Sequence, residues 1–179
     1  EGFEHQAEMP DVPAPEELMS PEEAGRIAGD RLPEALRSYL QSERPIEYRP
    51  VSLDRYIERK ALPASQHVWF RAVDALPDDP QIQRCILAYA SDLTLLDTAL
   101  LPHARTVFDR DVMPASLDHA LWLHRPFRCD EWLLYAQDSP NAGGARGLSR
   151  GMIFRRDGTL VASVAQEGLI RPVSPKKDT

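Results

Sequence analysis

The spacing of apolar residues in the middle of the chain predicts one long helix. Asp79 followed by Pro80 is typical of a helix start, because the Asp side chain can cap free backbone amides and proline fits the first turn. Apolar residues then recur at steps of three and four, which places them on one helix face over about six turns. The helix should end near Pro102. The apolar positions are Ile82, Ile86, Tyr89, Leu93, Leu96 and Leu100.

Most of the remaining chain has the period of two that is typical of β-strands. The predicted strand segments are 46–51, 67–73, 116–124, 131–138, 146–156 and 159–171. Asp157 and Gly158 separate the last two segments and favour a two-residue hairpin, because both residues tolerate a positive φ. The pattern predicts an α+β fold in which an antiparallel sheet wraps one long buried helix.

The N-terminal region has a different composition. Residues 1–19 contain three prolines among acidic and small residues, which favours an extended linker. Ser20, Pro21 and Glu23 then form a helix-start pattern, in which the hydroxyl caps a backbone amide and the carboxylate reaches back to the cap. This helix should break or kink near Pro33.

Charge narrows the range of partners. The 179 residues have a net charge of −7, and nine acids with a single base among residues 1–30 account for all of the negative excess. The rest of the chain is nearly neutral and lacks the basic field that attracts nucleic acid. No segment approaches the roughly 20 apolar residues that cross a bilayer, so we expect a soluble protein without a membrane partner. Cys85 and Cys129 are too few for a disulfide framework, which suits a cytoplasmic location.

Asp92 interrupts the apolar pattern of the long helix. It lies three residues after Tyr89 and four before Leu96, so its carboxylate falls on or beside the apolar stripe. One interpretation is an Asp at the edge of the stripe whose charge reaches solvent. The other is a general base, or a carboxylate that orients water, in a partly buried cleft.

Gln166 interrupts the last strand in a similar way. Alternation places its amide in line with the apolar side chains of Leu160, Ala162, Val164 and Ile170. It is either a structural Gln whose hydrogen bonds are satisfied at the sheet edge, or a site residue that offers both a donor and an acceptor to water or a carbonyl.

Other polar clusters favour no separate chemistry. Ser116 lies near Asp118 and His119, but adjacent strand residues point to opposite faces and no GxSxG elbow surrounds any serine, which argues against a serine hydrolase. We interpret His119 and His124 as surface or hydrogen-bonded core imidazoles. Neither the histidines nor the cysteines have the spacing of a metal site, so no metal or other cofactor is expected. The small-residue stretch 139–147 is interpreted as a loop or β-bulge, although its backbone amides could approach a phosphate or pantetheine group.

Three motifs together show a resemblance to a known family. They are SLDHALWLHRPF at 116–127, EWLLY at 131–135 and DGTLVASVAQEG at 157–168. In order and spacing they resemble the C-terminal half of acyl-CoA thioesterase II, the double-hotdog family, and the likeness covers roughly residues 45–171. GFEHQ at 2–6 is similar to the family's segment joining its two hotdogs.

The resemblance implies a hotdog fold and hydrolysis of fatty acyl-CoA. In that family an Asp, a Thr or Ser hydroxyl and a Gln position the attacking water, without a covalent acyl-enzyme. By motif position these residues are Asp92, Ser116 and Gln166. Asp92 and Gln166 are also the two residues that interrupt apolar patterns, which favours the site interpretation of both.

The resemblance also implies a domain division and a partner. Residues 1–44 correspond to the inter-domain linker and a helical segment, 45–173 to the C-terminal hotdog, and 174–179 to a tail. The first hotdog of the family is not in this chain, and its absence exposes a sheet edge and a helix face. We therefore expect a homo- or hetero-oligomer, formed with an N-terminal hotdog half (supplied by another chain or lost by cleavage) or by self-pairing. Ser116 replaces a common Thr and keeps the hydroxyl.

Two alternatives stay open beside the thioesterase. A non-catalytic hotdog half could serve dimerisation or acyl-CoA sensing. A hotdog dehydratase acting on 3-hydroxyacyl thioesters ranks last, because it would need a His against an acidic residue and the helix stripe contains no His.

Overall fold

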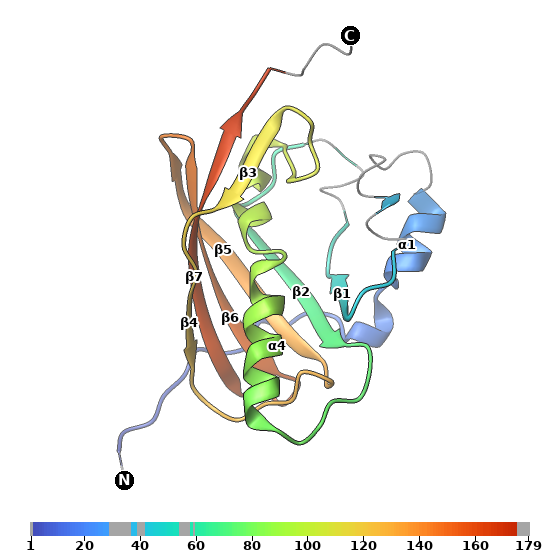
Figure 1. The fold of residues 1–179 in the computed structure, drawn as a ribbon, viewed down its shortest axis with the longest axis vertical. Helices are drawn as coiled ribbons and strands as arrows, with labels where there is room; N and C mark the ends of the chain where they lie inside the picture. Colours follow the sequence, from blue (N-terminus) through green and yellow to red (C-terminus); the bar gives the residue numbers. More distant parts are fainter. Residues whose placement is uncertain (1, 29–36, 39–41, 54–57, 59, 175–179) are drawn as a thin grey trace.

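A seven-stranded antiparallel sheet curls around a central helix (Figure 1). The computed structural model describes residues 2–28, 37–38, 42–53, 58 and 60–174. The strand order is β1-β2-β5-β6-β7-β3, and β4 pairs with a further part of β7. The strands are β1 (Ile46–Pro50), β2 (Ser65–Ala72), β3 (Val112–Ser116), β4 (Ala120–Leu123), β5 (Leu133–Gly143), β6 (Arg146–Arg155) and β7 (Leu160–Pro172). This architecture confirms the predicted α+β fold.

The helices begin at the predicted caps. In α1 (Pro21–Ala28), Glu23 N donates to Ser20 Oγ and Ser20 N donates to the Glu23 carboxylate, which forms the expected capping box. In α4 (Pro80–Asp92), the Asp79 side chain accepts from Gln81 N. The described residues also include two 3-10 segments, η1 (Pro15–Glu17) and η3 (Leu96–His103). The predicted kink near Pro33 lies outside the described residues.

The central helix is shorter than the apolar spacing predicts. The α-helix ends at Asp92, and the chain turns before continuing as η3. Side chains from the sheet replace helical hydrogen bonds at this break: Gln66 Nε2 donates to the carbonyl of Thr94 (3.1 Å), and Gln137 Nε2 donates to its hydroxyl (2.6 Å). The prediction of one uninterrupted helix was wrong, because apolar steps of three and four persist through a 3-10 segment.

The buried face of α4 also differs from the predicted stripe. Ile82 and Tyr89 are exposed, at 38% and 53%, whereas the buried side of the helix carries Gln83, Leu87, Ala90 and Ser91. The small residues let the helix approach the sheet closely. Gln83 is satisfied there because its Oε1 accepts from Cys129 N (2.6 Å). Polar residues with internal partners therefore occupy core positions that the predicted apolar stripe did not include.

One segment differs from the expectation that no part of the chain is long and apolar enough to cross a membrane. Pro80–His103 is long and apolar enough by length and composition. More than half of its most apolar window is buried inside the fold, as is typical of a core helix.

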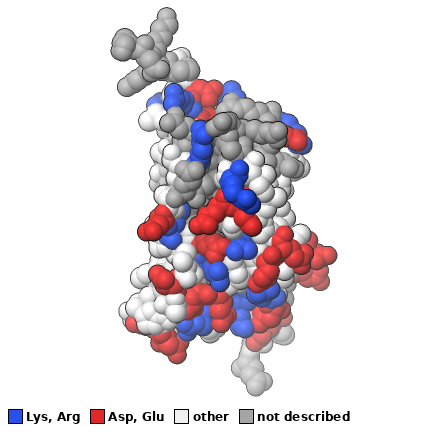
Figure 2. Space-filling view, turned by 90° about the vertical axis from the view of Figure 1, so that its right-hand side faces the viewer, with Lys and Arg blue, Asp and Glu red and all other residues white. Residues whose placement is uncertain are grey.

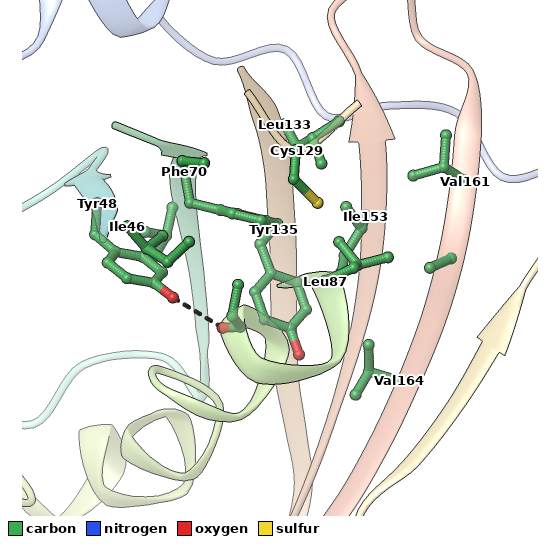
Figure 3. Close-up of a cluster of buried hydrophobic side chains, with 14 of the residues drawn as sticks. Ile46, Tyr48, Phe70, Leu87, Cys129, Leu133, Tyr135, Ile153, Val161 and Val164 are labelled. Atoms are coloured by element: carbon green, nitrogen blue, oxygen red, sulfur yellow. Dashed lines mark hydrogen bonds between the residues drawn. The ribbon is translucent and has the colours of Figure 1, made fainter. Parts of the chain in front are cut away.

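The main core lies between α4 and the concave face of the sheet. Figure 3 shows Leu87 of the helix among side chains from successive strands, including Phe70, Tyr135 and Ile153. The rings of Tyr48 and Phe70 stack at 6.0 Å between centroids, and Phe70 meets Tyr135 edge to face at 6.2 Å. These contacts join β1, β2 and β5 under the helix.

The strands depart from their predicted bounds at two places. Predicted segment 116–124 is two strands, because residues 117–119 leave the ladder between β3 and β4. The small-residue stretch belongs to the β5–β6 hairpin, with a register shift between Asp138 and Asn141 and a turn at Gly144–Ala145, both at positive φ. The β-bulge interpretation of this stretch is confirmed. The antiparallel β6–β7 hairpin around Asp157–Gly158 is also confirmed, but its turn is longer than the predicted two residues: β6 ends at Arg155, β7 begins at Leu160, and of the two residues only Gly158 has a positive φ.

The N-terminal strap, residues 2–20, covers the convex face of the sheet. It is largely extended, as its composition predicts, and it crosses behind the strands in Figure 1. Gln6 bonds the backbone where the last hairpin turn leads into β7, donating to Gly158 O (2.8 Å) and accepting from Leu160 N (3.1 Å). Trp69 Nε1 donates to Pro13 O (2.9 Å). Strap residues Met9, Val12 and Leu18 pack on a second buried cluster formed by Trp69, Trp132, Leu134, Ala136, Phe154 and Leu160.

Removal of residues 1–18 should therefore destabilise the domain. It would expose two buried tryptophans and Phe154 and lose the burial of three apolar strap side chains, each worth up to about 1.5–3 kcal/mol. We expect a lower urea midpoint, red-shifted tryptophan emission and increased binding of a hydrophobic dye. Removal of residues 1–5 is the matched control, because it leaves all of these contacts in place. Equal stability of the two truncated forms would contradict a packed strap.

Charged side chains of both signs are interspersed on the side of the molecule that carries α1 and β1 (Figure 2). Several are paired: Glu47 bonds both Arg49 and Arg71, and the two guanidinium groups lie 5.0 and 4.6 Å from the ring centroid of Trp132. This face therefore has a mixed charge rather than a single-sign field.

Candidate functional site

The break between α4 and η3 positions Asp92. The residue ends the α-helix, and its side chain is 47% exposed. Two buried tyrosines bond the carbonyls just before it: Tyr48 OH donates to Ala90 O (3.0 Å, Figure 3), and Tyr135 OH donates to Ser91 O (2.9 Å). The last carbonyls of a helix lack intrahelical partners, so these bonds stabilise its final turn. The core thereby holds the backbone that carries Asp92.

Tyr135 stays a donor in this position. Burial raises its pKa well above the ordinary value, and the negative charge of Asp92 adds to the shift. The phenol is therefore protonated at neutral pH, and its hydroxyl remains available to Ser91 O.

The three predicted residues meet at one point. Ser116 ends β3 and Gln166 lies within β7, close to the end of α4. Gln166 Nε2 donates to Asp92 Oδ1 (2.7 Å) and to Ser116 Oγ (2.6 Å), and Ser116 Oγ donates to Asp92 Oδ1 (3.1 Å). The structure thus brings Asp92, Ser116 and Gln166 together, while their roles in catalysis stay predictions.

The three side chains differ in exposure. Gln166 is fully buried, whereas Ser116 and Asp92 are exposed. Both donors reach the same carboxylate oxygen, and no described residue donates a hydrogen bond to the other one, Oδ2. A carboxylate that is fixed through one oxygen and belongs to an exposed side chain is suited to accepting a proton from water.

His119 is the site residue whose place sequence reasoning missed. Residues 117–119 form a loop rather than part of a strand, so the alternation of faces does not apply to them. The imidazole bonds Gln166 Oε1 through Nδ1 and Ser91 Oγ through Nε2, at 2.9 Å each. The interpretation of His119 as a hydrogen-bonded imidazole is therefore correct. The sequence feature that could have placed it at the site is the polar Asp118-His119 pair, which directly follows the end of β3.

The described residues form no site for metal binding, for a reactive thiol or for a serine nucleophile at Ser116. No group of three or more His, Cys, Asp or Glu residues there could hold a metal ion. Both cysteines are free thiols; Cys85 is exposed, and burial raises the pKa of Cys129 to about 12, which leaves it protonated and unreactive. The imidazole of His119 bonds Gln166 and Ser91 rather than Ser116, so Ser116 has no imidazole partner.

Ser149 lies directly opposite Gln166 in the β6–β7 ladder and is fully buried. Within the described part of the chain its Oγ makes no hydrogen bond. Burial of an unpaired hydroxyl costs about 1–3 kcal/mol, so Ser149→Ala should raise the free energy of unfolding by about 1 kcal/mol. Ser139→Ala is the matched control and should lower it, because Ser139 Oγ donates to Leu148 O (2.7 Å). Urea unfolding measures both, and equal losses would contradict this account of Ser149.

Comparison with known proteins identifies the class of fold and then the family. A protein from Alicyclobacillus acidocaldarius described as having a hot dog fold matches with a TM-score of 0.68, at 16% identity, over 97% of this chain and 59% of that one. The acyl-CoA thioesterase II TesB2 of Mycobacterium marinum matches with a TM-score of 0.73, at 43% identity, over 97% of this chain and 59% of that one. The fold is therefore a hotdog, as the resemblance implied.

The sequence comparisons agree. The family model described as "Acyl-CoA thioesterase" matches residues 36–169. Acyl-CoA thioesterase 2 of Haemophilus influenzae is 43% identical over 170 residues, which cover 95% of this chain and 59% of that protein. The chain belongs to the acyl-CoA thioesterase family. It spans somewhat more than half the length of these relatives.

Proposed function

We propose that the chain carries the water-activating site of an acyl-CoA thioesterase, which hydrolyses fatty acyl-CoA to free fatty acid and CoA. The observation that carries the proposal is the Asp92 carboxylate, which Gln166 and Ser116 hold through Oδ1 while its side chain stays 47% exposed. Family membership supports the substrate class.

In the proposed reaction Asp92 acts as the general base. It takes a proton from a water molecule whose oxygen attacks the thioester carbonyl carbon, and Gln166 and Ser116 fix the carboxylate in place. The carbon–sulfur bond then breaks, and the proton passes from Asp92 to the departing CoA thiolate. Ser116 acts as a hydrogen-bonding group rather than a nucleophile, because no imidazole contacts its hydroxyl.

The proposal includes a partner that covers exposed apolar surface. Ile82 and Tyr89 on α4 are exposed, as are Met113, Leu117, Trp122 and Leu123 along β3, β4 and the loop between them. Such a surface is typical of an interface. An N-terminal hotdog half or a second copy of this chain would bury it. The cytoplasmic location and the division at residues 44 and 173 stay predictions.

Thiol release from a medium-chain and a long-chain acyl-CoA tests the proposed function. The chain is assayed alone and mixed with an N-terminal hotdog half of a relative, with a thiol reagent reporting free CoA. We expect release in at least one assembly and no acyl group on the protein by mass spectrometry of the quenched reaction. Silence in every assembly, with acyl-CoA still bound, would instead favour the non-catalytic half. A covalent acyl adduct on Ser116 would contradict direct attack by water.

A further inference from the structure

The loop that carries His119 is fixed on β7 beside Gln166. Leu117 N and Asp118 N both donate to Glu167 O (3.0 and 3.3 Å), and Glu167 N donates to Asp118 Oδ1 (2.8 Å). These bonds hold the loop so that His119 lies next to Gln166, the residue before Glu167 in β7. His119 as a whole residue is exposed, but its side chain is only 23% exposed, so the imidazole is partly buried.

The proton positions around Gln166 follow from its partners. An ionised carboxylate only accepts hydrogen bonds, so the side of the amide that faces Asp92 must be the NH2 group. Its two hydrogens go to Asp92 and Ser116. The amide oxygen then faces His119 Nδ1 at 2.9 Å, and this nitrogen must carry a proton.

The other imidazole nitrogen is held from the helix. Nε2 lies 2.9 Å from Ser91 Oγ, whose hydroxyl also lies 3.0 Å from Ala88 O. In a neutral ring Nε2 accepts from Ser91, and in a protonated ring it donates while Ser91 bonds Ala88. Either arrangement keeps the proton on Nδ1. A charged group also lies near the ring: the Asp92 carboxylate, whose Oδ1 is 4.0 Å from Nδ1.

We propose that His119 is a positioning residue that locks the Gln166 amide with its NH2 group toward Asp92 and Ser116. The inference rests on the proposed function. Without the Nδ1 donor, the fully buried Gln166 oxygen loses its hydrogen-bond partner, and the amide is no longer held from both ends. The Gln166 amide and the Asp92 carboxylate that it bonds would then be less precisely positioned. His119 thus acts on the reaction through Gln166.

Two near-isosteric substitutions of His119 distinguish the role of Nδ1 from that of Nε2. In His119→Asn the side-chain amide nitrogen takes the place of Nδ1 and can still donate to Gln166, whereas in His119→Gln it reaches toward the place of Nε2. We expect His119→Gln and His119→Leu to lower kcat about 10- to 100-fold with KM changed less than about threefold, since misplacement by about 1 Å can cost that much. His119→Asn should retain kcat within about threefold of the original chain.

His124→Leu is the matched control. Its imidazole is also bonded to a serine, Ser163, but lies away from Gln166 and Asp92. We expect its kcat to be unchanged. An equal loss in His119→Asn and His119→Leu would overturn the donor role, and so would full activity in His119→Leu.

A readout without substrate keeps the inference separate from the proposed function. Nitrogen-15 NMR of the histidine side chains reports which ring nitrogen carries the proton, and we expect Nδ1 of His119 to be protonated. The Gln166 side-chain NH2 signals should shift in His119→Leu and stay in place in His124→Leu. An Nδ1 without a proton overturns the proposal. The expected NMR result in a chain that releases no thiol in any assembly would uphold the orientation of Gln166 and reject the thioesterase function instead.

Discussion

Asp92→Asn should remove most thioester hydrolysis, with a fall in kcat of about 10²- to 10⁴-fold. The amide oxygen of Asn can still accept the hydrogen bonds that Gln166 and Ser116 donate to Oδ1, so the local network is preserved. What is lost is the ability to take a proton from water. The measurement is thiol release from acyl-CoA in the assembly that is active with the original chain.

Asp138→Asn is the matched control for this substitution. The two carboxylates are almost equally exposed, at 47% and 48%, but Asp138 pairs with Arg150 on the neighbouring strand, away from the site. We expect Asp138→Asn to keep full turnover. Both variants should unfold within about 1 kcal/mol of the original chain, because neither side chain is buried. Turnover by Asp92→Asn at the original rate would contradict the role of Asp92 as general base.

Gly151→Ala should destabilise the domain strongly for a single substitution. A Cβ at this position would lie 2.1 Å from Tyr135 Cε2, well inside van der Waals contact. The ring cannot move aside easily, since Tyr135 is fully buried and its hydroxyl is bonded to Ser91 O. Overpacking of this kind costs about 1–3 kcal/mol or more. Because Ser91 precedes Asp92, movement of the ring should also disturb the site.

Gly143→Ala is the control for Gly151→Ala. Gly143 also lies in a strand of the same hairpin, and a Cβ there would meet nothing within 4 Å. Urea unfolding should show a clear fall in midpoint for Gly151→Ala and little change for Gly143→Ala. Equal stability of the two variants would mean that the contact between Gly151 and Tyr135 is not tight.

Local patterns were sufficient for the parts of the fold that depend on neighbouring residues. The caps at Ser20 and Asp79 form as predicted, and the hairpin around Asp157–Gly158 forms where Gly158 supplies the positive φ that its turn needs. The interruptions of apolar patterns at Asp92 and Gln166 were also visible locally. Ser116 had no such signal from its neighbours, and its assignment came from the resemblance alone.

Other features required the tertiary structure. The chain turns after Asp92 because Gln66 and Gln137, from two strands, bond Thr94, and no local pattern contains those partners. The strap has the composition of a linker, yet it packs because the convex face of the sheet offers it an apolar surface. The sequence pattern predicts that His119 lies in a strand, whereas the structure has it in the loop after β3, beside Gln166.

The sequence by itself therefore determined the α+β class, most strand positions, the helix starts and two anomalous polar residues, since these depend on capping, turn preferences and periodicity over a few residues. The tertiary structure decided where the helix breaks, which of its faces is buried and how the polar residues meet. Ser116 is 24 residues from Asp92, and Gln166 is 74 residues from it. Their contact exists only because the curled sheet brings β3 and β7 to the end of α4, and interactions over such separations leave no local pattern in the sequence.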